Sequence, residues 1–246
     1  KRKIKYHLID VASPRSVFSL AKYQKLAFKA IDQIIAQGRL PIVVGGSGLY
    51  LQALVDNYQL SKIKPDNLLR QELEKLDKTE LQERLQKINF QFFSKLNNSD
   101  KNNPRRLVRY IEILSQEAGF RAGGGPEKYD FLLLGLECPQ EKLNKRIKQR
   151  LLSRLDEGLL AEIKKLHRLG VSYARLDKFG LEYRYGARYL QGMMNYETFV
   201  NSLFQAICRF SKKQTTWFKR WQKQNRKIHW LSGLNEAKKL VRDFIE

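Results

Sequence analysis

The chain has 246 residues, 42% of them hydrophobic and 11% aromatic, which is typical of a globular protein rather than a disordered one. Its 47 Lys and Arg residues against 25 Asp and Glu residues give a net charge of +22, and this excess favours a polyanionic partner, with nucleic acid the first candidate. No apolar run reaches the length of a membrane span, about 18 residues, and the first residues lack the apolar stretch of a signal peptide. Two cysteines and three histidines without metal-ligand spacing argue against a zinc site or a disulfide framework, so we expect a cytoplasmic protein that does not associate with membranes.

The first elements predict an α/β core. Residues 7–11 form a short strand-like piece, and Ser19 fits the N-cap of a helix that runs to about Gln37. Residues 42–44 are an apolar, β-branched run without a polar face, which predicts a strand buried on both sides of a parallel sheet. Strand, helix and strand in this order predict a right-handed crossover.

A glycine turn follows the second predicted strand. Gly45, Gly46, Ser47 and Gly48 separate it from apolar residues at helical spacing. In open α/β sheets ligands bind at the carboxyl ends of strands, and glycines there let the backbone approach a ligand closely. Ser47 would face such a ligand with its hydroxyl and amide. The alternative is an ordinary turn before a helix N-cap serine, without any ligand.

The middle of the chain, residues 58–128, predicts a helical lobe inserted between core segments 1–57 and 129–246. We expect a helix at 68–76 capped by Asp66 or Asn67, a helix at 79–88 and, after a break at 97–104, a helix at 105–116. The glycine-rich segment 119–125 predicts a hinge or a shortened loop.

The second half returns to the sheet with a predicted buried strand at 129–137. A helix over 140–156 follows, in which Arg146, Arg150 and Arg154 recur every four residues beside a leucine stripe. Three stacked guanidiniums cannot neutralise one another, so Arg146 and Arg150 are candidates for a clamp on diphosphate oxygens. The alternative is the solvated face of a basic helix.

The chain after residue 158 predicts helices at 159–169, 181–190, 196–213 and 236–245, and a strand at 229–231. Within 211–221, the basic side chains of Lys212, Lys213 and Lys219 alternate with the aromatic rings of Trp217 and Trp221. Lysines contact phosphates and aromatic rings stack on unpaired bases, so this segment predicts an RNA-facing edge. The alternative for the aromatic rings is packing in the core.

Five segments in this order resemble the tRNA dimethylallyltransferase family, also called tRNA isopentenyltransferases. They are IVVGGSGLY (42–50), NNPRRLVRYIE (102–112), RIKQRLLSRLDEG (146–158), GLEYR (180–184) and KKQTTW (212–217). The resemblance implies a P-loop-type α/β fold, a parallel sheet core flanked by helices, with a helical insertion that grips the anticodon stem-loop. It also implies transfer of a dimethylallyl group from dimethylallyl diphosphate to the N6 amine of the adenosine 3′-adjacent to the anticodon, with Mg²⁺.

The resemblance also assigns residues. It implies catalytic roles for Ser47, which stands where the family has a threonine whose hydroxyl meets the flipped adenine, and for Arg146 and Arg150 at the diphosphate. Gly45, Gly46 and Tyr50 belong to the implied substrate site. The positions implied to contact RNA are Arg70, Asn102, Asn103, Pro104, Arg105, Arg106, Phe179, Gly180, Leu181, Glu182, Tyr183, Arg184, Lys212, Lys213, Gln214, Thr216, Trp217 and Lys219. GLEYR replaces the shorter VGYR of many members, and Lys213 and Lys219 replace usual arginines.

One family motif is absent from these residues. Members of the family begin with a P-loop, GxxxxGK[ST], and an aspartate-bearing strand, and neither occurs here. Because the P-loop supplies amides, a lysine and a Mg²⁺-binding hydroxyl, we expect a fragment that lacks most Mg²⁺ ligands and binds RNA without transferring the prenyl group. The alternatives are a non-catalytic RNA-binding module and a P-loop nucleotide kinase-like enzyme. A monomer is expected.

Overall fold

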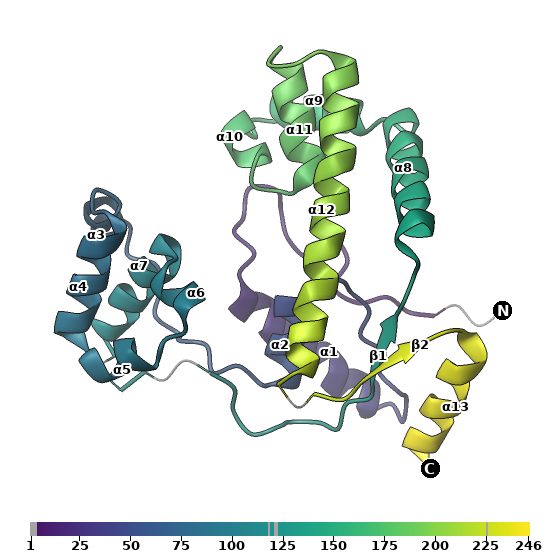
Figure 1. Ribbon diagram of the computed structural model, residues 1–246, viewed down its shortest axis with the longest axis horizontal. Coiled ribbons are helices and arrows are strands. Elements are labelled where there is room, and N and C mark those ends of the chain that lie inside the picture. The colour runs from purple at the N-terminus through teal and green to yellow at the C-terminus, as the bar shows by residue number, and fades with distance from the viewer. Residues whose placement is uncertain (1–3, 118, 121–122, 225) are drawn as a thin grey trace. The chain divides into compact units, whose positions relative to one another are not determined.

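The computed structural model describes residues 4–117, 119–120, 123–224 and 226–246. It divides the chain into two compact units. The core unit consists of residues 1–51 and 129–246, and the inserted unit consists of residues 52–128 (Figure 1).

The described part of the core unit contains a small parallel sheet. Strand β1 (Leu133–Leu136) pairs in parallel with β2 (Ile228–Leu231), with Leu133 opposite Ile228. Gly135 faces Trp230 in this register, and a Cβ on the glycine would lie 2.6 Å from Cε3 of the indole. The glycine is therefore required for the tryptophan to lie flat across the neighbouring strand. The parallel pairing confirms the predicted sheet type, but β1 is shorter than the expected 129–137 and is not buried as predicted, since Leu136 is 83% exposed.

The two strands predicted nearer the N-terminus are wrong. Residues 8–10 form a bend, and residues 7, 11 and 41–45 have no regular secondary structure. Ile42 and Val44 are 78% and 89% exposed, so the run is not buried on either side. An apolar β-branched run favours a strand, but a strand also needs a neighbouring backbone to accept and donate its hydrogen bonds. Among the described residues no strand pairs with either segment, and the predicted crossover is therefore not formed.

The helices of the core unit follow the predicted pattern closely. Helix α1 (Leu20–Ile35) begins at the predicted cap, where the Ser19 side chain accepts a hydrogen bond from the backbone N–H of Lys22. Helix α12 (Tyr196–Gln222) extends nine residues beyond the predicted end and includes the basic–aromatic segment. Helix α10 (Tyr173–Leu176) was not predicted. The remaining helices of this unit are α2 (Gly48–Val55, which continues into the inserted unit), α8 (Gln140–Asp156), α9 (Leu159–Arg168), α11 (Leu181–Leu190) and α13 (Leu234–Ile245).

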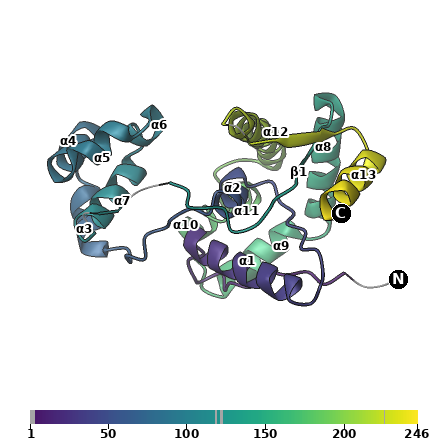
Figure 2. The same ribbon diagram turned by 90° about the horizontal axis from the view of Figure 1, so that it is seen from below.

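Helix α12 is the longest helix in the described part of the chain and organises the core unit. Its N-terminal half buries Phe199 and Leu203 against Leu151 of α8. The two helices run antiparallel, because α8 begins at the end near β1 while α12 ends there (Figure 1). Figure 2 shows the same elements with α12 seen close to its axis.

The inserted unit is helical and begins at residue 52, whereas the sequence predicts a lobe from residue 58. Leu73, Leu81, Leu85, Leu107 and Ile111 form its core, each with at most 1% of its surface exposed. Its helices are α3 (Asn67–Leu73), α4 (Lys78–Ile88), α5 (Phe90–Lys95), α6 (Asn98–Lys101) and α7 (Pro104–Leu114).

The caps of these helices decide one open alternative. The Asp66 side chain accepts hydrogen bonds from the backbone N–H groups of Leu68 and Leu69, so Asp66 rather than Asn67 caps α3. Asp77 and Glu80 form a reciprocal capping box at the start of α4, one residue before the predicted start. The short helices α5 and α6 were not predicted, and the expected hinge at 119–125 lies partly outside the described residues.

Candidate functional site

The glycine turn is held against the C-terminal half of α12. The side-chain Nε2 of Gln214 donates a hydrogen bond of 2.9 Å to the carbonyl oxygen of Gly46. A Cβ on Gly48 would lie 2.2 Å from Cδ1 of Trp217, so the indole fills the space that any larger residue would need. Two motifs that the sequence predicts separately, the glycine turn and KKQTTW, therefore lie side by side in the core unit.

Ser47 lies between these two contacts, directly before α2. Its carbonyl oxygen accepts hydrogen bonds from the backbone N–H groups of Tyr50 and Leu51, at 3.0 and 3.1 Å. Its side chain is exposed, and its hydroxyl makes no hydrogen bond to a described residue, so it is available to a ligand. Tyr50 stacks on Tyr23 of α1, with 4.4 Å between ring centroids, and burial followed by the charge of Tyr50 raises the pKa of Tyr23.

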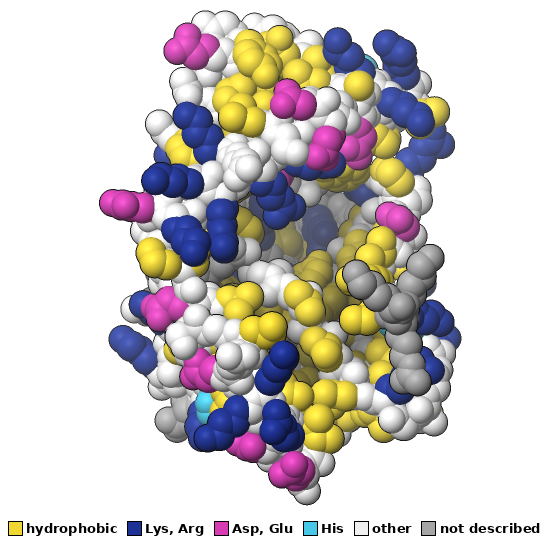
Figure 3. All heavy atoms as spheres, turned by 90° about the vertical axis from the view of Figure 1, so that its right-hand side faces the viewer, with side chains coloured by type: hydrophobic (Ala, Val, Ile, Leu, Met, Phe, Trp, Pro, Cys, Tyr) yellow, Lys and Arg dark blue, Asp and Glu magenta, His cyan; other side chains and the backbone are white. Residues whose placement is uncertain are grey.

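The α12 segment next to the turn presents basic side chains. Lys212, Lys213 and Lys219 are exposed, and the guanidinium of Arg220 lies 4.5 Å from the ring centroid of Trp217. The hydroxyl of Thr216 donates to the Lys212 carbonyl oxygen at 2.9 Å, which keeps that side chain on the helix. Figure 3 shows Lys and Arg side chains scattered over the whole of one face of the molecule, among hydrophobic and acidic ones. The aromatic residues divide between the two predicted roles, because Trp221 is buried and Trp217 is half-buried against the turn.

The three arginines in the row on α8 differ in whether they are paired with a carboxylate. Arg154 forms an ion pair of 3.5 Å with Glu162 of α9, so it is not available in the way the sequence suggests. Arg146 and Arg150 are exposed and make no hydrogen bond or ion pair with the residues that the structure describes. Leu151 of α8 packs against Leu203 of α12, and the two helices are antiparallel. Arg146, which precedes Leu151, and Gln214, which follows Leu203, are therefore displaced from this contact in the same direction. The convergence of the two arginines with Ser47 stays a prediction.

The GLEYR segment is tied into the core unit by its own side chains. Gly180, with φ +147°, precedes α11, and Arg184 Nε donates at 3.1 Å to both the carbonyl and the carboxylate of Asp177. The Tyr183 hydroxyl donates to Glu162 at 2.7 Å, and burial together with this bond raises the pKa of Tyr183 to about 12. Phe179 meets the Tyr183 ring edge-on. RNA contacts from Leu181 and Glu182 of this segment stay predictions as well.

In the inserted unit, NNPRR forms the start of α7. Asn103 is the N-cap and Pro104 the first helical residue, as their types favour. Asn102 caps the end of α6 and donates to Asn98, while Arg106 forms an ion pair with Asp100. Arg105 is exposed and has no ion-pair partner within the described ranges.

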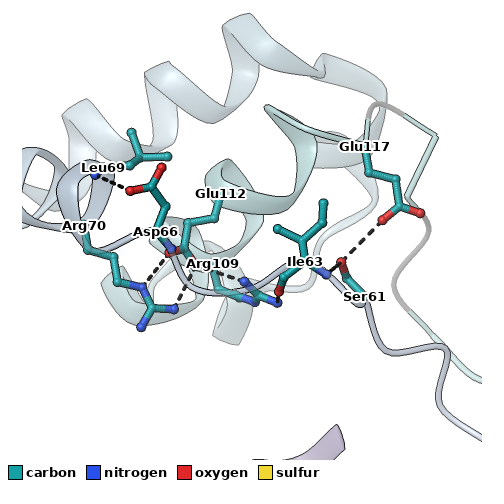
Figure 4. Close-up of polar contacts among 8 residues, drawn as sticks. All are labelled: Ser61, Ile63, Asp66, Leu69, Arg70, Arg109, Glu112 and Glu117. Carbon is teal, nitrogen blue, oxygen red and sulfur yellow. Dashed lines mark hydrogen bonds and ion pairs between the residues drawn. The ribbon is translucent and has the colours of Figure 1, made fainter.

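A buried carboxylate that sequence reasoning missed lies in the inserted unit (Figure 4). Glu112 of α7 is fully buried and accepts hydrogen bonds from Arg70 Nε at 2.6 Å and Nη2 at 2.8 Å. Arg109 Nη1 donates at 3.1 Å and the backbone N–H of Asp66 at 3.0 Å. Burial alone would raise the pKa of Glu112, but these hydrogen bonds outweigh it and leave the pKa below its usual value.

The comparison with known proteins decides the family. The family described as IPP transferase matches residues 1–221 of this chain. The chain belongs to the IPP transferase family. A tRNA dimethylallyltransferase of Syntrophus aciditrophicus is 40% identical over 235 residues, which are 94% of this chain and 75% of that protein.

Solved structures of the IPP transferase family share the fold. The full-length tRNA isopentenylpyrophosphate transferase of Bacillus halodurans is 29% identical, covers 97% of this chain and 76% of its own, and has a TM-score of 0.62. A eukaryotic dimethylallyltransferase described as acting on tRNA has a TM-score of 0.65 at 24% identity, over 86% of this chain and 55% of its own, and supports the fold alone. Both the predicted family resemblance and the predicted α/β fold class are therefore confirmed.

The IPP transferase resemblance implies Mg²⁺ as a cofactor. Among the described residues, no group of three His, Cys, Asp or Glu side chains is placed to hold a metal ion. Mg²⁺ binding by this chain stays a prediction. Over the same residues, no helix combines the length and apolar character that a membrane crossing requires.

Proposed function

We propose that this protein is a tRNA dimethylallyltransferase, acting on the N6 amine of the adenosine 3′-adjacent to the anticodon. The observation that supports this most directly is the turn at Ser47. The exposed hydroxyl of Ser47 lies at the start of α2. The turn is attached to α12 by the hydrogen bond from Gln214 to Gly46 and by the packing of Trp217 on Gly48. The same stretch of α12 carries exposed lysines suited to an RNA backbone.

Prenyl transfer requires one group that binds the amine and another that stabilises the leaving diphosphate. The carbon–oxygen bond of dimethylallyl diphosphate breaks and diphosphate leaves with the electron pair, while the N6 amine forms the new carbon–nitrogen bond and loses a proton. Ser47 is proposed to hydrogen-bond the amine. Arg146 and Arg150, without carboxylate partners in the described structure, are proposed to stabilise the charge that develops on the leaving diphosphate.

RNA binding is proposed to involve both units. The adenine must leave its stack, at a cost of a few kcal/mol that contacts with the surrounding walls offset. Exposed lysines of α12 and Arg105 of α7 are proposed to contact phosphates, and the inserted unit to bind the anticodon stem-loop. We further propose that the protein acts as a cytoplasmic monomer with Mg²⁺.

A second candidate is favoured by one observation, the absence of GxxxxGK[ST] from these 246 residues. A non-catalytic RNA-binding module would share the basic α12 segment and the inserted unit. We propose that the 246 residues alone bind the anticodon stem-loop and do not transfer the prenyl group.

Two labelled donors test the proposal. Dimethylallyl diphosphate labelled in its alkyl group and ATP labelled at the γ-phosphate are each offered with an anticodon stem-loop hairpin. The enzyme is either the 246-residue chain or the same chain with a relative's P-loop segment joined before residue 1. We expect alkyl label in RNA with the longer version, and binding without transfer with the 246 residues. Phosphate transfer from ATP, or the absence of RNA binding by both versions, would overturn the proposal.

A further inference from the structure

Glu112 connects three separate parts of the inserted unit. Its two carboxylate oxygens accept four hydrogen bonds, two from Arg70 of α3, one from Arg109 of its own helix and one from the backbone N–H of Asp66 (Figure 4). Four bonds occupy the full acceptor capacity of a carboxylate. Arg109 also donates from Nη2 to the carbonyl oxygen of Ile63 at 2.7 Å, so the chain entering α3 is fixed by the same group.

The charges in this cluster do not cancel. Two guanidiniums on one carboxylate leave one positive charge, and the carboxylate is fully buried while the side chains of Arg70 and Arg109 are 36% and 30% exposed. Arg70 Nη1 makes no hydrogen bond to a residue in the described ranges. Lys62 and Lys64, on either side of Ile63, are exposed as well. The two guanidiniums therefore reach solvent while the Glu112 carboxylate does not, and the exposed carboxylate of Glu74 at the end of α3 offsets part of the charge of Arg70.

We infer that Glu112 is a positioning residue that orients Arg70 and Arg109, together with Lys62 and Lys64, as a phosphate-binding face for an RNA stem. This inference rests on the proposed function and adds a role for a residue that touches no RNA. A guanidinium held by two parallel hydrogen bonds keeps its remaining N–H groups in a fixed direction, so less side-chain freedom is lost when a phosphate binds.

A positioning role for Glu112 and a purely electrostatic effect predict opposite changes in RNA affinity when Glu112 is replaced. Glu112→Gln removes one negative charge, so electrostatics alone predicts tighter RNA binding and a steeper salt dependence. If Glu112 positions the arginines, the same change weakens binding, because a neutral amide cannot hold both guanidiniums. The inserted unit offers a matched control, since Glu72 of α3 pairs with Arg84 of α4 at 2.6 Å on the exposed surface.

The test measures the affinity of the 246-residue chain for an anticodon stem-loop hairpin over a range of salt concentrations. We expect Glu112→Gln to bind about tenfold more weakly, the effect of one lost charge-assisted hydrogen bond, and Glu72→Gln to bind as well as the unchanged chain or better. Arg70→Lys, which keeps the charge and loses the two-bond geometry, is expected to show a similar loss, and Arg84→Lys none. Arg70→Lys combined with Glu112→Gln is expected to lose no more than either alone.

Circular dichroism checks that each variant is folded. If Glu112→Gln does not fold, Arg70→Lys against Arg84→Lys decides, because both arginines are partly exposed. Unchanged or tighter hairpin binding by a folded Glu112→Gln chain, or by Arg70→Lys, overturns the inference. The proposed function is unaffected by that result as long as the unchanged chain binds the hairpin. If the unchanged chain does not bind the hairpin, the inference falls, and the proposed function falls with it only if the version that carries a P-loop segment does not bind either.

Discussion

Gln214 donates its side-chain amide hydrogen to the carbonyl oxygen of Gly46, across 168 positions of sequence. This bond and the packing of Trp217 on Gly48 attach the glycine turn to α12. Because α12 is also packed against α8 through Leu203, one helix carries contacts to both of the elements that hold the proposed reaction site. The position of the turn therefore depends on α12 rather than on a neighbouring strand.

Gly48→Ala tests this attachment. The added methyl group would meet the rigid indole of Trp217 at 2.2 Å, so either the turn or the ring must move, and we expect a loss of about 1–3 kcal/mol in the free energy of unfolding. Gly45→Ala is the control, because a Cβ there meets nothing within 4 Å. Urea unfolding followed by tryptophan fluorescence measures both. Equal losses for the two variants would show that the packing on Gly48 does not matter.

The features predicted correctly are those that depend on residues close together in the sequence. Helices α1, α8 and α11 were predicted well, since their apolar spacing lies within each segment and Ser19 caps α1 directly before its first residue. The strand at 42–44 was wrong because strand formation depends on a distant partner backbone that an apolar run cannot specify. Glu112 was missed for the same reason, since Arg70 lies 42 positions away. Its spacing of three from Arg109 on one helix was the available signal.

The arginines of α8 give a second prediction. In the version that carries a P-loop segment, Arg146→Ala and Arg150→Ala are each expected to lower turnover by about 100-fold, since each removes charge stabilisation of the leaving diphosphate. Affinity for the hairpin should stay unchanged. Arg154→Ala is the matched control, because Arg154 is paired with Glu162. Steady-state kinetics and hairpin titration separate the effects, and a loss confined to hairpin affinity would contradict the diphosphate role.

Acid sensitivity of the inserted unit is the third prediction. The folded-state pKa of Glu112 is below the usual 4.5, so its ionised form stabilises the fold above that pH and this contribution is lost as the pH falls through the lowered value. Glu112→Gln is expected to cost about 1–3 kcal/mol at neutral pH and to flatten the fall in stability below about pH 4.5. Thermal unfolding across this range measures it, with Glu72→Gln as control. Parallel curves for Glu112→Gln and the unchanged chain would contradict the assignment.

Ser47 carries the central claim, that the exposed hydroxyl at the turn takes part in prenyl transfer to RNA. The direct measurement is the turnover of Ser47→Thr and Ser47→Ala with labelled dimethylallyl diphosphate and the hairpin, in the version that carries a P-loop segment. We predict that Ser47→Thr, which keeps the hydroxyl, transfers label at a rate near that of the unchanged protein, and that Ser47→Ala is slower by about 100-fold. Transfer by Ser47→Ala at the unchanged rate would contradict the account.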